Sequence, residues 1–251
     1  IWKKGNTAGN VPEFFTGLSP LVEDGKCFIH TGSAGKGEIT AYDLGTGNER
    51  WKYATEGPSY ATPSVMNIQG KKHLVVMTEK SILALDINDG KLLWQIPAPP
   101  AQRFYNSVSP VIDGSRIYIT GQGTGTKAIE VSLQGGRYVT RELWSNNTTG
   151  SKWNTPVLRD GSLYGFSDQR RIFCIDAATG KTNWTDNATT SDFSTLLDCG
   201  TVFTGLASTG NLIIFRPDRT KYAGVATYKV ADTPVYSYPV ISGNKIWVKD
   251  A

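Results

Sequence analysis

The fold is decided by the stretch Ile39-Thr40-Ala41-Tyr42-Asp43-Leu44-Gly45-Thr46-Gly47-Asn48-Glu49-Arg50-Trp51. It combines an apolar segment, a turn that holds two glycines and an asparagine, and a second segment that reaches a tryptophan. Glycine and asparagine tolerate the positive φ angles that tight hairpins need. The stretch therefore predicts two antiparallel strands joined by a short turn.

The same unit returns along the chain at a nearly constant interval. Asp43 and Asp86 lie 43 positions apart, and Asp86 and Asp176 lie 90 apart, which is two intervals of 45. A copy at 128–136 fills the gap with Ser132 in the aspartate position, and a degraded copy at 212–218 has a tyrosine where the tryptophan is expected. The tryptophans that close the units are Trp51, Trp94, Trp144 and Trp184. Such a period is typical of a repeat architecture.

Prolines form a second marker, out of phase with the first. They stand at Pro20, Pro63, Pro110, Pro156 and Pro239, each before an apolar segment, a turn and another apolar segment. Proline is tolerated at the first residue of a strand because no ladder hydrogen bond is lost there. Each period therefore holds four short strands. Four strands in roughly 40–50 residues are typical of a β-propeller blade.

We interpret residues 1–251 as a single all-β propeller domain of four-stranded antiparallel blades. The pattern predicts five complete blades, at 18–53, 61–96, 108–145, 154–185 and 194–230, and two strands of a sixth at 238–250. Residues 1–4 are expected to form a blade-closing strand, which could complete the sixth blade. The favoured alternative is a fragment of an eight-bladed propeller, whose open blade edges would promote self-association.

Composition excludes some classes of protein. The 251 residues carry a formal net charge of +4, with basic and acidic residues scattered along the chain. This gives no case for a nucleic-acid partner. No apolar run approaches the roughly 20 residues of a membrane-spanning helix. The three cysteines have no metal-ligand spacing, and we expect them to be buried apolar residues.

The pattern Ala-x-Asp-x-x-Thr-Gly followed by tryptophan resembles the tryptophan-docking motif of the quinoprotein (PQQ-like) β-propeller family. Residues 41–51 and 174–184 match it, with one residue fewer before the tryptophan and Cys174 for alanine in the second copy. The resemblance implies that Trp51, Trp94, Trp144 and Trp184 pack between neighbouring blades. Within that family, the chain resembles the non-catalytic bacterial branch, the outer-membrane assembly propeller. That branch is exported, which implies a periplasmic or extracellular location.

The loops that lead into the innermost strands carry the candidate binding residues. These are Phe15, Tyr60, Arg103, Tyr105, Asn106, Lys152, Trp153, Asp192 and Tyr236. In a propeller such loops meet at one end of the central channel, which predicts an aromatic-rimmed funnel for a ligand or a protein. The alternative is that the rings only pack against one another and cap the blades.

The favoured function is therefore a non-catalytic scaffold that binds a protein or ligand on its loop face. One alternative is a PQQ-dependent dehydrogenase, for which the resemblance implies PQQ and calcium, and another is a carbohydrate- or polymer-binding module. No cysteine pair of the kind found in quinoprotein dehydrogenases is present. We predict no catalytic residue, metal ligand or cofactor. Asp43, Asp86 and Asp176 precede glycine turns, where an aspartate is expected to accept backbone N–H groups.

Overall fold

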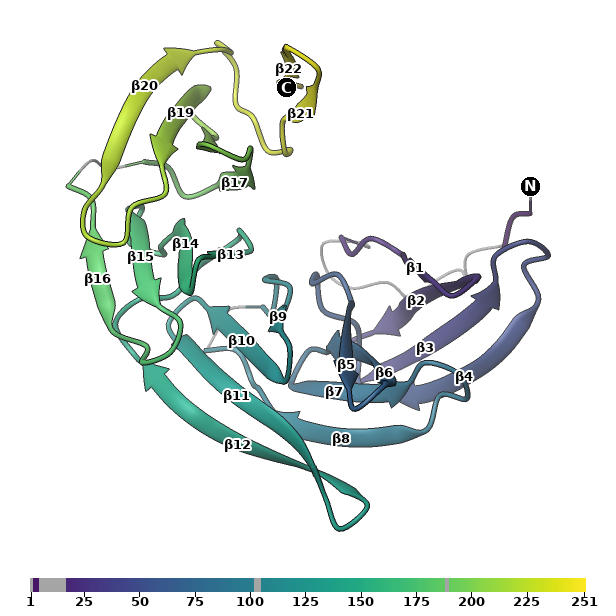
Figure 1. Ribbon diagram of the computed structural model, residues 1–251. Coiled ribbons are helices and arrows are strands. Elements are labelled where there is room, and N and C mark those ends of the chain that lie inside the picture. The colour runs from purple at the N-terminus through teal and green to yellow at the C-terminus, as the bar shows by residue number, and fades with distance from the viewer. Residues whose placement is uncertain (1, 5–16, 102–104, 188–189) are drawn as a thin grey trace. The chain divides into compact units, whose positions relative to one another are not determined.

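The computed structural model describes residues 2–4, 17–101, 105–187 and 190–251 (Figure 1). In those residues all regular structure is β, in 22 strands. A search of the same residues finds no helix that is long and apolar enough to cross a membrane.

The strands form five four-stranded sheets and one two-stranded sheet. The first sheet holds β1 (Leu21–Glu23), β2 (Lys26–Ser33), β3 (Lys36–Asp43) and β4 (Glu49–Thr55). The second holds β5 (Ser64–Ile68), β6 (Lys71–Met77), β7 (Ser81–Asp86) and β8 (Leu92–Pro97). The third holds β9 (Val111–Asp113), β10 (Arg116–Gly121), β11 (Gly125–Gln134) and β12 (Arg137–Asn146).

The remaining sheets follow in chain order. The fourth holds β13 (Val157–Arg159), β14 (Ser162–Phe166), β15 (Ile172–Asp176) and β16 (Thr182–Thr185). The fifth holds β17 (Ser194–Asp198), β18 (Phe203–Ala207), β19 (Asn211–Arg216) and β20 (Ala223–Lys229). The last pairs β21 (Val240–Ser242) with β22 (Lys245–Trp247).

This architecture confirms the predicted propeller of four-stranded antiparallel blades. In every sheet the strands lie side by side in chain order. The proline markers fall where expected, since β1, β5 and β9 each begin at the residue after a proline. One prediction is wrong: residues 2–4 form no strand. Trp2 instead donates its indole N–H to the carbonyl oxygen of Leu44, at 2.8 Å.

The chain divides into two compact units, one of residues 1–119 with 129–143 and the other of residues 120–128 with 144–251. In the first unit β7 is buried along its whole length, and Leu74, Val75 and Val76 of β6 are at most 1% exposed. Both faces of these two strands are covered where their sequences are continuously apolar, at 74–77 and 82–85, rather than alternating. In the second unit aromatic residues form the core.

The aromatic core of the second unit lies between its fourth and fifth sheets. Tyr164 and Phe203 have ring centroids 4.9 Å apart, and Phe203 and Phe215 are 5.4 Å apart. All three side chains are at most 1% exposed. Burial of such large rings stabilises a small two-sheet core strongly.

The hairpins between the third and fourth strands have the same backbone hydrogen bonds in the first, second and fourth sheets. In the second sheet Asp86 N–H donates to Lys91 O and Gly90 N–H donates to Asp86 O, at 2.8 and 2.9 Å. The Asp86 carboxylate also accepts the Asn88 N–H, at 2.9 Å. Asp43 and Asp176 make the corresponding bonds in the first and fourth sheets. The carboxylates therefore hold the turns, as an aspartate before a glycine turn should.

Three tryptophans each join a hairpin to a strand earlier in the chain. Trp51 donates its indole N–H to Ile87 O at 3.2 Å, and Trp144 donates to Ala177 O at 3.1 Å. Trp184 similarly reaches Asp218 O, at 2.9 Å. Trp94 differs, because its indole N–H donates to His73 Nδ1 in its own sheet. By analogy with the other units, the Trp94 indole N–H is expected to bond to the next hairpin, which is the copy with Ser132 in the aspartate position.

Candidate functional site

Trp153 stands at the entrance to β13 and is held there by its neighbour Asn154. The Asn154 side chain donates to Phe166 O at 2.8 Å and accepts from Phe166 N–H at 3.1 Å. Asn154 is only 3% exposed, so these two bonds are made in a buried environment, where they are costly to break. The loop that carries Trp153 is therefore fixed to the last residue of β14.

Three aromatic rings form a ladder from this loop. The ring of Trp153 stacks on Phe193, with centroids 5.5 Å apart and planes 12° apart. Phe193 in turn meets Tyr236 edge to face, at 5.4 Å. Phe193 is 40% exposed and Tyr236 is 65% exposed. Neighbouring rings that remain this open to solvent are unusual for residues whose task is packing alone.

The ladder borders a pocket of about 80 Å³ in the second unit. Its lining residues are Trp153, Phe193, Ser194, Thr195, Leu206, Val235, Tyr236 and Tyr238. Leu206 and Val235 are nearly fully buried and supply an apolar floor. Trp153 Nε1 and Thr195 Oγ1 are buried and have no hydrogen-bond partner among the described residues. The pocket thus has apolar walls, and two of its lining residues hold buried polar atoms that lack a partner among the described residues.

An ion cluster adjoins the aromatic ladder. Asp192 accepts two hydrogen bonds from the Arg170 guanidinium, at 3.0 and 2.9 Å, and lies 3.7 Å from Lys152 Nζ. The hydrogen bonds from Arg170 lower the pKa of the Asp192 carboxyl below its usual value, and the positive charge of Lys152 lowers it further. The Lys152 ammonium also lies 5.6 Å from the Trp153 ring centroid. Two cations therefore share one carboxylate beside the pocket.

Four of the predicted binding residues come together here: Lys152, Trp153, Asp192 and Tyr236. Three others form a separate group in the first unit. Tyr60 and Tyr105 meet edge to face at 5.7 Å, and Tyr60 N–H donates to Asn106 O at 3.0 Å. The Asn106 amide donates to Thr78 O and Ala98 O, so its side chain ties together backbone segments. Phe15 and Arg103 lie outside the described residues, and the common funnel of all nine stays a prediction.

Some residues of the pocket and of the ion cluster beside it have no counterpart in the sequence prediction. Tyr238 precedes a marker proline, and its position two residues after Tyr236 is a signal that an extended segment presents both side chains on one side. Thr195 is one residue inside β17, and Arg170 lies in the β14–β15 turn. No sequence pattern points to either residue.

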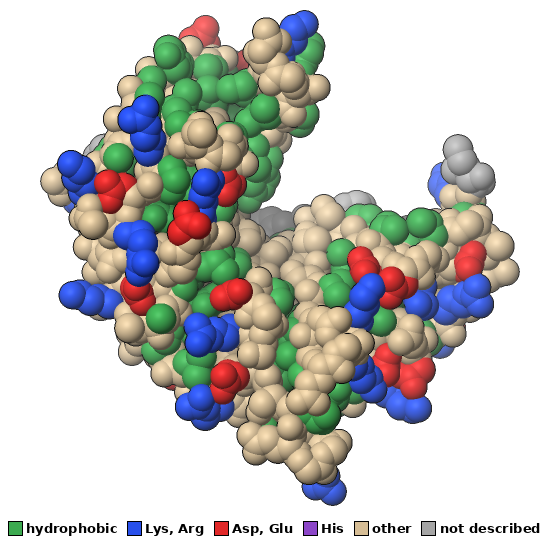
Figure 2. Space-filling view, viewed as in Figure 1, with side chains coloured by type: hydrophobic (Ala, Val, Ile, Leu, Met, Phe, Trp, Pro, Cys, Tyr) green, Lys and Arg blue, Asp and Glu red, His purple; other side chains and the backbone are tan. Residues whose placement is uncertain are grey.

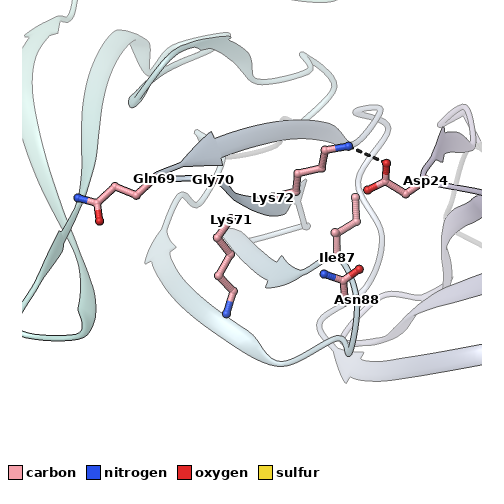
Figure 3. A pocket seen from close by; sticks show the side chains of 7 residues that line it. All are labelled: Asp24, Gln69, Gly70, Lys71, Lys72, Ile87 and Asn88. Carbon is pink, nitrogen blue, oxygen red and sulfur yellow. Dashed lines mark hydrogen bonds and ion pairs between the residues drawn. The ribbon is translucent and has the colours of Figure 1, made fainter.

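A second pocket, of about 550 Å³, lies at turns of the first and second sheets (Figure 3). Figure 3 shows Lys72 directed toward Asp24, where Nζ and Oδ1 are 2.7 Å apart. Lys71 pairs with Asp86 at 2.8 Å. Basic and acidic side chains are likewise interspersed on the face drawn in Figure 2. With both lysines paired and no aromatic ring in its lining, this pocket is a weaker candidate than the one beside Trp153.

The described residues show no site that identifies a quinone cofactor or calcium, and the absence of both stays a prediction. They contain no group of three or more histidine, cysteine, aspartate or glutamate residues that could hold a metal ion. The pocket beside Trp153, at about 80 Å³, is far below the roughly 300–1,000 Å³ of typical cofactor sites.

Comparison with known proteins places the chain in a family. It belongs to the family of outer membrane protein assembly factor BamB, whose model matches residues 1–221. This match and the fold confirm the resemblance to PQQ-like propellers. A comparison with curated protein sequences finds no significant match.

Solved structures show the same fold. BamB from Moraxella catarrhalis superposes with a TM-score of 0.62 at 21% identity, covering 94% of this chain and 69% of that one. A quinohemoprotein alcohol dehydrogenase from Comamonas testosteroni gives 0.58 at 16% identity, covering 90% of this chain and 44% of that one. The chain thus spans less than half the length of the dehydrogenase.

Proposed function

We propose that this chain is a non-catalytic scaffold that binds a protein partner through the loop residues of its second unit. The family name suggests that the partner takes part in the assembly of outer membrane proteins, and hence that the chain works in the periplasm or at the cell surface. The observation that carries the proposal is the open ladder of Trp153, Phe193 and Tyr236 beside the Arg170–Asp192–Lys152 cluster.

Interface physics supports this assignment. Tyrosine, tryptophan and arginine are enriched at the centres of protein interfaces, where an aromatic ring buries a large area at a small cost in side-chain entropy. Phe193 and Tyr236 keep 40% and 65% of their surface exposed, so a partner can still bury them. The ion cluster would form the polar rim of the interface.

Site-specific photo-cross-linking tests the proposal. A photoreactive side chain is introduced at Tyr236, and in a control at Ala178, a residue of the β15–β16 hairpin in the same unit. Both variants are expressed in the native host, and cross-linked proteins are identified by mass spectrometry. We expect one protein to be captured from position 236 and not from position 178. Equal capture at the two positions would contradict a specific interface.

The exposed rings also suit a carbohydrate ligand, because sugar rings stack on aromatic faces. A glycan array probed with the purified chain distinguishes the two functions. Saturable binding of one glycan class that is lost on Tyr236→Ser, with no protein cross-link, would favour the carbohydrate-binding module.

A further inference from the structure

We draw no further inference here: the strongest candidate, the cavity of about 80 Å³ beside Trp153 at the start of β17, belongs to the site already described, and nothing in the structure shows what occupies it.

Discussion

The indole nitrogen of Trp51 lies 3.2 Å from the carbonyl oxygen of Ile87, a residue of the next hairpin 36 positions along the chain. The same ring lies against Gly90, where a Cβ atom would come within 2.5 Å of it. Trp144 stands in the same relation to Ala177 and Gly180. The glycine of the motif thus makes room for a tryptophan from another sheet and also forms a turn.

Substitution of Gly90 tests this relationship. In Gly90→Ala the new methyl group would lie within 2.5 Å of the Trp51 ring, and the alanine would have to adopt a strained backbone with φ of +72°. The control Gly70→Ala has a similar φ of +83° but nothing within 4 Å of the new atom. We expect Gly90→Ala to lower the free energy of unfolding by about 2 kcal/mol more than Gly70→Ala, measured by urea denaturation. Equal losses would mean that the ring contact contributes nothing.

Two buried histidines should make the fold sensitive to mild acid. Burial lowers the pKa of both His30 and His73 to about 4, from an ordinary value near 6.5. Below pH 6.5 the unfolded chain takes up protons that the folded chain does not, so stability falls as the pH drops from 6.5 to 4. Each histidine should contribute a loss of about 1–3 kcal/mol.

Urea titrations between pH 7.5 and 4.5 measure this loss. His73→Gln should be less stable than the native chain at pH 7.5, because His73 Nδ1 accepts the Trp94 N–H. Its stability should nevertheless decline less steeply with falling pH. A parallel decline in native chain and variant would contradict the assignment of the slope to His73.

Asp86 should govern a second acid transition at lower pH. Burial raises the pKa of this carboxyl, but its ion pair with Lys71 and its bond from Asn88 N–H outweigh burial and hold the pKa below the usual value. The stabilisation is therefore present above about pH 4 and is lost as the carboxylate protonates. We expect Asp86→Ala to lose about 1–2 kcal/mol at pH 7 and to differ less from the native chain at pH 3. A difference that is independent of pH would refute this.

Substitutions at the open end of the aromatic ladder should separate binding from stability. Tyr236→Ser changes a side chain that is 65% exposed, so the free energy of unfolding should move by no more than about 0.5 kcal/mol. Cross-linking from a photoreactive group at Phe193 should nevertheless be lost in that variant. A large drop in the unfolding midpoint would instead show that the ring mainly packs.

The two-stranded sheet should promote self-association. Val240 and Trp247 are 61% and 58% exposed, and β22 pairs on only one side among the described strands (Figure 1). Unpaired edges with apolar side chains readily add strands. Sedimentation velocity should show concentration-dependent association of the native chain that Trp247→Lys reduces. A chain that is monomeric at all concentrations would contradict the prediction.

The repeat was readable because each blade reuses a few residues with fixed roles. Pro63 marks the start of β5 and Asp86 the hairpin after β7, and both follow from local backbone chemistry. The partner of Trp94 could not be predicted, because the choice of His73 depends on a neighbouring hairpin that lacks the aspartate. The site was only partly predictable for a similar reason. Loop position indicated Trp153 and Asp192, whereas the salt link to Arg170 depends on how two turns meet.

The departure of Trp94 from the pattern has a mechanical consequence. Its indole hydrogen bond stays within the second sheet, so the junction with the third sheet lacks the indole-to-carbonyl bond that Trp51 makes to the next hairpin. Apolar packing holds this junction, with hydrogen bonds where the two sheets begin, from Thr62 N–H to Ser109 Oγ and from Ser64 Oγ to Pro110 O. Apolar packing resists shear less specifically than a directional bond. Under a pulling force we therefore expect the second and third sheets to separate more readily than the first and second sheets, whose junction has the Trp51 bond.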